Sequence, residues 1–155
     1  MNDREAVALQ LGRKPAPFRV AARCPAGLPS VIENERRREM PTTFWLTCST
    51  LQAAISRVEA TGGVRAAQEE IGAEAVDATH AEHLARYGVR VAGVGAAEGT
   101  TSAGRVKCLH AFTALHLAGA LPNPVAEWTL AHLRETPYPD PARCPVCVEC
   151  LEQTS

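Results

Sequence analysis

The character of the sequence changes near residue 48, and that change limits the folds open to this chain. Apart from a short helical stretch at the start, residues 1–48 contain runs rich in β-branched and aromatic residues, at 18–24, 30–33 and 42–48. Beyond residue 48, apolar residues recur at helical spacing. Strand segments followed by helical segments are typical of α+β domains. We therefore expect a small antiparallel sheet of two or three strands, packed by four or five helices.

Capping residues mark the ends of the expected helices. Asp3 is expected to cap a helix over residues 4–11, because Asp side chains accept hydrogen bonds from first-turn amides. Ser49 or Thr50 is expected to cap the next helix for the same reason. Further helices are expected over residues 64–71, 73–87 and 106–118, and from Asn123-Pro124 onward, where Asn is the cap and Pro opens the first turn.

Length and charge restrict the class of protein. A chain of 155 residues fits one domain, and we expect residues 1–135 to form it, with 136–155 as a Pro/Cys-rich C-terminal tail. The 16 Lys and Arg and 17 Asp and Glu give a net charge of −1, which argues against a nucleic-acid partner. The most apolar stretch, residues 111–121, is too short to span a bilayer, and the first ten residues do not resemble a secretory signal. We expect a cytoplasmic protein without membrane insertion.

Three dispersed cysteines and a histidine form the first candidate metal site. Cys24 and Cys48 each end an expected strand, and Cys108 lies near an expected helix start, two residues before His110. If those strands pair, the two thiols converge near a helix N-terminus, whose partial positive charge favours thiolate. Three sulfurs and one imidazole complete a tetrahedral zinc site. Three sulfurs alone suit an iron–sulfur cluster with an open iron, and buried thiols acting as small apolar side chains are the alternative.

The spacing of Cys108 and His110 sets a condition on that site. Residues two apart on a regular helix point about 200° away from each other. Both can bind one metal only if residues 106–109 form a loop or a distorted first turn. Otherwise the fourth ligand must be a carboxylate, water or another histidine: His80, His83 or His116. His80 and His83 lie three apart and share a helix face, as a metal pair or as solvated or capping histidines, whereas His132 is expected at the surface.

The tail holds a second, local group of cysteines: Cys144, Cys147 and Cys150. Their close spacing resembles part of a ferredoxin ligand run and predicts a second metal or redox group. A zinc ribbon would need another C-x-x-C pair, which the chain lacks, so further ligands would come from elsewhere. No strand–motif–helix context of the thioredoxin type surrounds the motif, which disfavours a dithiol redox pair.

Basic residues near the dispersed cysteines are the candidates for anion binding. Arg23 precedes Cys24, Lys107 precedes Cys108, and Arg57 lies on the expected helix after residue 50. Together they could form an anion pocket beside the metal. The alternative is that all three are ordinary solvated charges.

Several short motifs together resemble an uncharacterised bacterial family, the domain of unknown function numbered 501. They occur in the family's order over roughly residues 5–130: Arg23-Cys24-Pro25, Phe44-Trp45-Leu46-Thr47-Cys48, Ser56-Arg57-Val58-Glu59, Val106-Lys107-Cys108-Leu109-His110 and Asn123-Pro124. The resemblance implies no established activity. In the family the position of Cys48 can be His, and cysteine and histidine interchange well as zinc ligands. Ser49 stands where the family often has Pro, and the tail cysteines lie outside the family pattern.

Two functions follow as hypotheses. The first is a metal-binding protein, with zinc at Cys24, Cys48, Cys108 and His110, in a structural or regulatory role; it predicts a closed four-ligand site. The alternative is a metal- or thiolate-dependent enzyme acting on a small anionic substrate, with an iron–sulfur cluster as one form of the metal. There Cys108 is nucleophile or ligand and His110 is the acid–base group. It predicts an open pocket lined by Arg23, Arg57 and Lys107.

Overall fold

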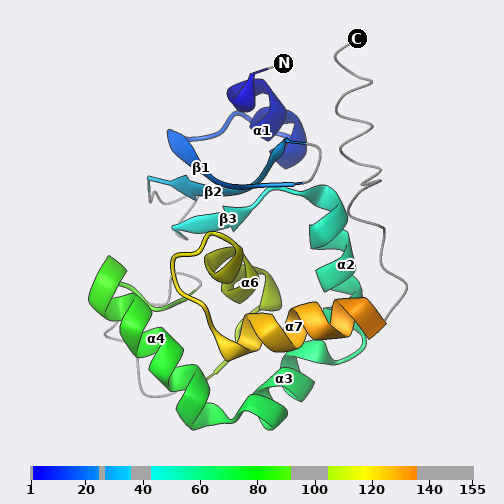
Figure 1. Cartoon of the computed structure of the whole chain (residues 1–155), viewed down its shortest axis with the longest axis vertical. Coiled ribbons are helices and arrows are strands. Elements are labelled where there is room, and N and C mark those ends of the chain that lie inside the picture. The colour runs from blue at the N-terminus through cyan, green and yellow to red at the C-terminus, as the bar shows by residue number, and fades with distance from the viewer. Residues whose placement is uncertain (1, 25–26, 36–42, 92–104, 136–155) are drawn as a thin grey trace.

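A computed structural model describes residues 2–24, 27–35, 43–91 and 105–135. These residues form one three-stranded sheet and six helices, which confirms the α+β class. The expected number of helices was four or five. Helix α1 lies on one side of the sheet and the remaining helices lie on the other (Figure 1). The tail, including Cys144, Cys147 and Cys150, lies outside the described residues.

The sheet is antiparallel in the order β1-β2-β3, formed by β1 (Phe18–Arg23), β2 (Pro29–Asn34) and β3 (Phe44–Leu46). Val20 of β1 faces Ile32 of β2, and Ile32 in turn faces Trp45 of β3. The strands that precede Cys24 and Cys48 are therefore the two edges of the sheet, separated by β2. The direct pairing that would have brought those two cysteines together is not formed.

The helices in the middle of the chain match their expected ranges closely, whereas the starts of some other helices differ from those expected. They are α1 (Asp3–Leu11), α2 (Ser49–Ala60), α3 (Gly63–Ile71), α4 (Ala73–Tyr87), α6 (Leu109–Leu117) and α7 (Pro124–Glu135). None of the helices in the described part of the chain is both long enough and apolar enough to cross a membrane.

Two helix starts differ from the expected capping residues. Cys48, not Ser49 or Thr50, is the N-cap of α2, without a side-chain cap hydrogen bond. Asn2, not Asp3, caps α1: its Oδ1 accepts from the Glu5 N–H at 2.8 Å, and the Glu5 carboxylate accepts from the Asn2 N–H at 3.2 Å. This reciprocal pair satisfies two amides at once. Asp3 instead forms an ion pair with Arg23 at 2.7 Å, which ties α1 to β1.

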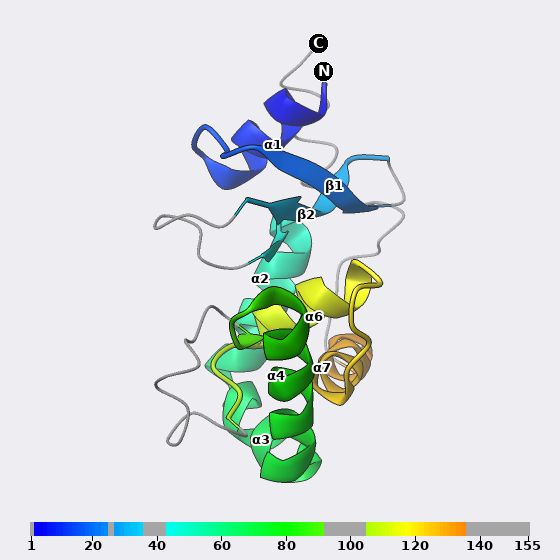
Figure 2. The ribbon, with the colours of Figure 1, turned by 90° about the vertical axis from the view of Figure 1, so that its left-hand side faces the viewer.

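Alternating side chains divide the sheet between two clusters of buried residues. Val31, Phe44 and Leu46 face the large core formed with α2, α6 and α7. Ile32 instead joins Val7 of α1 in a small cluster on the opposite face. The period of two along each strand produces this division. Figure 2 shows the resulting layers in order: α1, the sheet, and then the helical layer.

Candidate functional site

The start of α6 positions two of the predicted site residues. Cys108 is the N-cap of α6 and has an extended backbone (φ −150°, ψ 149°), and its sulfur accepts from the N–H of Ala111 at 3.5 Å. The helix begins three residues later than expected, since the backbone of Cys108 is extended, and the Val106 N–H before it donates to Gln68 Oε1 of α3 at 2.7 Å. Cys108 therefore precedes the regular helix, and His110 lies in the first turn of that helix. Because the backbone of Cys108 is not helical, the divergence of side chains two apart on a regular helix does not apply to this pair.

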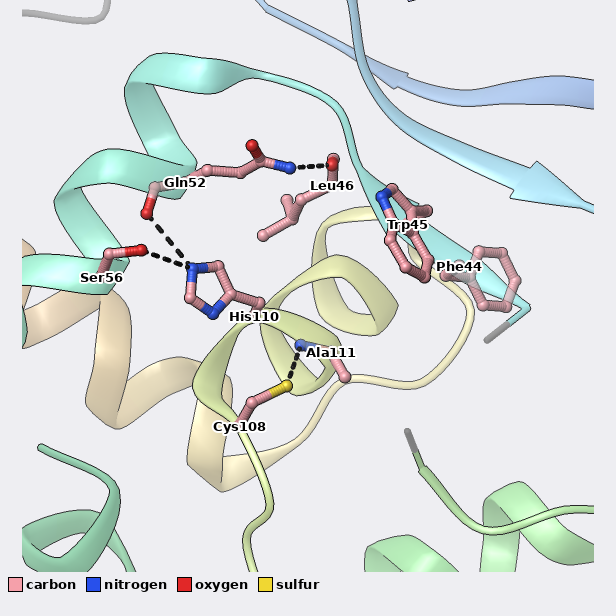
Figure 3. A pocket seen from close by; sticks show the side chains of 8 residues that line it. All are labelled: Phe44, Trp45, Leu46, Gln52, Ser56, Cys108, His110 and Ala111. Carbon is pink, nitrogen blue, oxygen red and sulfur yellow. Dashed lines mark hydrogen bonds between the residues drawn. The ribbon is translucent and has the colours of Figure 1, made fainter. Parts of the chain in front are cut away.

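Both residues line a pocket of about 360 Å³ between β3, α2 and α6. Figure 3 shows the His110 ring between the two helices, with Cys108 on the α6 side and the aromatic residues of β3 across the opening. The described lining residues are Phe44, Trp45, Leu46, Gln52, Ser56, Cys108, His110 and Ala111. A volume near 360 Å³ lies at the lower end of the range of small-molecule sites.

The imidazole of His110 contacts three groups of α2. Its Nε2 lies 3.2 Å from the Ser56 hydroxyl oxygen and 3.2 Å from the backbone carbonyl oxygen of Gln52 (Figure 3). Its Nδ1 lies 3.3 Å from Oε2 of Glu59. The same Glu59 oxygen accepts the N–H of Leu109 at 2.8 Å and so caps α6. Glu59 therefore holds the His110 ring at Nδ1 and also caps the helix that carries this histidine.

The tautomer of His110 decides what these contacts can do. A proton on Nδ1 donates to the Glu59 carboxylate and leaves Nε2 free to accept the Ser56 hydroxyl proton. When Nε2 also carries a proton, it can donate to the Gln52 carbonyl oxygen, so both charge states of the ring find partners. A carboxylate, an imidazole and a hydroxyl in this order form the arrangement that activates serine nucleophiles.

The Cys108 thiol is held in its protonated form by its surroundings. Burial is the largest influence and raises its pKa, and the negative charge of Glu59 raises it further. The Ala111 N–H and Lys107 act in the opposite direction and lower the pKa, but their effect is smaller. Being at a helix N-terminus is therefore not enough to make Cys108 a thiolate here.

The three dispersed cysteines are not gathered at one point. The Cys24 N–H donates to the Leu28 carbonyl at 2.9 Å and the Cys48 N–H to the Ser30 carbonyl at 3.4 Å, so these cysteines flank the start of β2. Cys48 precedes α2, whereas Cys108 lies near Glu59 at the other end of that helix. Eleven residues of helix separate Cys48 from Glu59, a rise of about 16 Å.

No cluster of three or more Cys, His, Asp or Glu side chains with metal-ligating geometry occurs within residues 2–24, 27–35, 43–91 and 105–135. His110 also directs both ring nitrogens to groups of α2, as described above. The zinc and iron–sulfur expectations for Cys24, Cys48, Cys108 and His110 stay predictions.

The basic residues expected to bind an anion are placed apart from the described wall of the pocket. Arg23 donates to the Asp3 carboxylate and, at 3.0 Å, to the Gly27 carbonyl. Arg57 and Lys107 are exposed on α2 and just before α6. None of the three is among the described lining residues.

The remaining histidines have structural partners. His80 and His83 are buried at 1% and 2% exposure, not solvated, and contact the carbonyl oxygens of Arg105 and Val89, each at 2.6 Å. His116 Nδ1 accepts the Asn123 N–H at 3.2 Å. His132, expected at the surface, is half-buried and stacks on Trp128 with ring centroids 3.6 Å apart.

Sequence reasoning missed Ser56 and Glu59 as site residues. They are three apart on α2 and therefore share one helix face. The signal was present in the Ser56-Arg57-Val58-Glu59 motif, but only the fold shows that this face meets His110.

Comparison with known proteins places this arrangement in a family. No curated protein and no solved structure compared with the chain gave a match. The sequence model of a family described as "Protein of unknown function (DUF501)" matches residues 20–92 and 75–131. These ranges contain the three strands from Val20 on, together with Ser56, Glu59, Cys108 and His110. Since the match covers well over half of the chain, the protein belongs to the DUF501 family.

Proposed function

We propose that this protein is a hydrolase of small carbonyl compounds, with Ser56 as nucleophile, His110 as general base and Glu59 as the carboxylate that orients the base. The observation that supports it is the continuous path from Glu59 Oε2 to His110 Nδ1 at 3.3 Å and from His110 Nε2 to Ser56 Oγ at 3.2 Å. The path ends on the wall of a pocket. Of the two hypotheses from the sequence, this keeps the enzyme and the role of His110 but moves the nucleophile from Cys108 to Ser56.

The proposed reaction proceeds through an acyl-enzyme. Ser56 Oγ attacks the substrate carbonyl carbon, and the Ser56 proton moves to His110 Nε2. Collapse of the tetrahedral intermediate breaks the bond to the leaving alcohol, which takes the proton from Nε2. Water then adds to the acyl group with His110 again as base, and the acid leaves as the Ser56 hydroxyl is restored.

Two further groups fit the charges that this reaction develops. The imidazolium formed after proton transfer has the Glu59 carboxylate at Nδ1 and the Gln52 carbonyl oxygen at Nε2. The first turn of α6 borders the same pocket through Ala111; its Leu109 and Ala111 N–H groups already donate to Glu59 and Cys108, so only its partial positive charge would favour a developing oxyanion. Cys108 is less suited as the attacking group, because its raised pKa keeps it a thiol.

Covalent labelling and hydrolysis test the proposal together. The full chain is treated with a fluorophosphonate, the modified residue is mapped by mass spectrometry, and hydrolysis of 4-nitrophenyl acetate is followed. We expect the label on Ser56, and a roughly 10²- to 10⁴-fold loss of kcat/KM in Ser56→Ala and His110→Gln. Ser49→Ala, on the same helix, and His132→Gln are the matched controls and should keep full activity.

The outcomes separate the candidate nucleophiles. Labelling of Cys108 by iodoacetamide, with hydrolysis lost in Cys108→Ala but kept in Ser56→Ala, would return the nucleophile to the thiol. Equal hydrolysis by the wild type and both Ser56→Ala and His110→Gln variants would overturn the proposal. Circular dichroism of each variant shows whether a loss of activity reflects unfolding.

A second candidate is zinc binding by Cys24 and Cys48, whose backbone N–H groups donate to carbonyls two residues apart at the start of β2, those of Leu28 and Ser30. Two thiols there supply part of a tetrahedral ligand set. Elemental analysis of anaerobically purified wild type, Cys24→Ala and Cys108→Ala tests it. About one zinc per chain, lost in Cys24→Ala, is the expected result. Iron with sulfide would favour the cluster instead, and the absence of metal in wild type would refute both.

A further inference from the structure

We infer that the ligand of the pocket formed by β3, α2 and α6 is a small, uncharged carbonyl compound that carries one aromatic or branched apolar group. This inference rests on the proposed hydrolase function for its turnover, but its binding component can be measured separately. It replaces the small anionic substrate expected from the sequence.

The walls of the pocket determine this class of ligand. Phe44, Trp45 and Leu46 of β3 form the side of the pocket opposite His110, and Ala111 of α6 completes the apolar lining (Figure 3). Tyr87 packs edge-on against Phe44 with ring centroids 5.6 Å apart, which holds that ring in place. A fixed aromatic wall favours offset or edge contacts with a flat apolar group.

The polar groups of the pocket are few and are gathered on one side. They are the Ser56 hydroxyl, the Cys108 thiol, the His110 imidazole and the Gln52 amide. Gln52 donates its side-chain N–H to the Leu46 carbonyl oxygen, so that donor is already engaged. One polar edge facing an apolar wall matches a ligand with a single carbonyl group at one end and hydrocarbon at the other.

Charge argues against an anionic ligand. Among the described residues that line the pocket, none is Lys or Arg, and the carboxylate of Glu59 lies directly behind His110. Within the described part of the chain, a carboxylate or phosphate in this largely apolar pocket would meet no Lys or Arg on the pocket wall, and only the partial charge of the first turn of α6 would offset its lost hydration. Arg57 and Lys107 are exposed and are not among the described lining residues, although Lys107 lies close enough to Cys108 to lower the pKa of its thiol slightly.

The size of the pocket sets the size of the ligand. A volume of about 360 Å³ lies at the lower end of the range for small-molecule sites. A phenyl ring with a short ester is a ligand of that size class. Phenyl acetate is therefore a suitable substrate probe, and acetophenone, which cannot be hydrolysed, is its matching binding probe.

The experiment compares neutral and charged ligands on the full chain and on two pocket variants. Acetophenone binding is measured by calorimetry in the wild type and in Ser56→Ala, and hydrolysis of phenyl acetate is compared with that of 4-acetoxybenzoate, its carboxylate analogue. Ala111→Leu fills the pocket, and Ala53→Leu adds the same side chain at an exposed site on α2. We expect binding in wild type, Ser56→Ala and Ala53→Leu, at least tenfold weaker binding in Ala111→Leu, and at least tenfold faster hydrolysis of the neutral ester.

The results distinguish failure of this inference from failure of the proposed function. Acetophenone binding that depends on Ala111, without ester turnover, would leave the ligand class standing and refute the hydrolase. Suppose instead that ester turnover depends on Ser56 but the carboxylate ester is hydrolysed as fast as the neutral ester or faster. The hydrolase would then stand and the ligand class would be refuted. No acetophenone binding to wild type, or equal binding by Ala111→Leu, would overturn the ligand class.

Discussion

Glu59 shows how much a single residue contributes in this fold. Its Oε2 accepts the Leu109 N–H at 2.8 Å and faces His110 Nδ1 at 3.3 Å, so one carboxylate both caps α6 and orients the proposed base. Ser56, one turn earlier on α2, has an exposed side chain whose hydroxyl lies 3.2 Å from His110 Nε2. Loss of Glu59 should therefore affect stability and chemistry together, whereas loss of Ser56 should affect chemistry alone.

Gly63 is required because of a close approach. A Cβ atom at this position would lie 2.5 Å from the Val58 carbonyl oxygen and 2.6 Å from Val58 Cγ1, at the tight connection between α2 and α3. Gly63→Ala should therefore lower the free energy of unfolding by about 2 kcal/mol, as expected for overpacking. Urea denaturation followed by circular dichroism measures it.

The neighbouring Gly62 is the control for Gly63. Its φ of 88° favours glycine, but a Cβ there would meet nothing within 4 Å. Gly62→Ala should therefore cost only the backbone strain, about 1 kcal/mol. If Gly63→Ala were the milder of the two substitutions, the packing of α3 against the end of α2 would differ from that described.

His80 should make stability depend on pH. Its Nε2 donates to the Arg105 carbonyl oxygen at 2.6 Å, and its Nδ1 accepts the Val91 N–H at 3.2 Å, so the neutral ring fits both partners. Burial lowers its pKa, and Arg90 adds to that effect while Asp77 opposes it. Because the folded pKa lies below the unfolded value of 6.5, the stabilisation is present above pH 6.5 and is lost as the pH falls towards the folded pKa.

Denaturation midpoints between pH 5 and pH 8 test this prediction. Replacing His80 with Gln should lower stability at pH 8 by about 2 kcal/mol, since two buried backbone groups lose their partner. It should also flatten the pH dependence, whereas His132→Gln should leave the slope unchanged. An unaltered slope in His80→Gln would show that other groups cause the acid sensitivity.

At the scale of residues, the sequence predicted types of side chain better than their partners. Cys108 and His110 were identified and do line one pocket. Ser56 and Glu59 were missed, because helical spacing shows that they share a face of α2 but not what that face meets. Arg23 was a candidate for an anion site or an ordinary solvated charge, and in the structure it pairs with Asp3 of α1.

At the scale of elements, α7 depends on one side chain at its start. Asn123 is 2% exposed; its Oδ1 accepts the Ala126 N–H at 2.9 Å, and its Nδ2 donates to the Phe112 and Leu121 carbonyls at 3.0 and 3.1 Å. It thus caps α7 and joins it to α6. Because all three contacts are buried, Asn123→Ala should lower the free energy of unfolding by about 2 to 3 kcal/mol, which is more than the loss of an ordinary exposed cap.

Asn123→Asp separates the two roles of this residue. The carboxylate keeps the acceptor for the Ala126 N–H but cannot donate to the two carbonyls. If the bonds to the Phe112 carbonyl of α6 and to the Leu121 carbonyl carry most of the stabilisation, Asn123→Asp should be nearly as unstable as Asn123→Ala in thermal denaturation. Wild-type stability in Asn123→Asp would mean that the cap alone matters.

Elements with strong local signals were predicted well, and elements fixed by distant contacts were not. The pattern predicted α4 over residues 73–87, its observed span, and Asn123-Pro124 marked the start of α7. The start of α6 was placed three residues early, because residues 106–108 precede the helix with Cys108 extended and the Val106 amide bonded to Gln68 of α3. No local signal in residues 106–108 carries that information.

At the scale of the whole molecule, the sheet separates two clusters of unequal size. The large cluster joins the sheet to α2, α6 and α7 and contains the base of the pocket, including Phe44 and Leu46. The small cluster has Val7 and Ile32 as its buried residues and joins α1 to the opposite face. The α+β class followed from the order of the elements in the sequence. The placement of α1 did not, because one short helix can pack on either face.

This division predicts that α1 opens independently of the pocket. Besides the apolar contacts of Val7 and the partly buried Leu11, α1 is tied to the sheet by the exposed Asp3–Arg23 pair and by a hydrogen bond from Gln10 Nε2 to the Pro29 carbonyl oxygen at 2.7 Å. An exposed ion pair contributes little. Hydrogen exchange followed by mass spectrometry should therefore show α1 amides exchanging well before those of α6.

Val7→Ala should remove the remaining protection of α1 while leaving α6 and acetophenone binding unchanged. Leu9→Ala, at a side chain of the same helix that is 45% exposed, should change neither. If Val7→Ala also lowered protection in α6, the two clusters would unfold as one unit, and the pocket would depend on the layer behind the sheet.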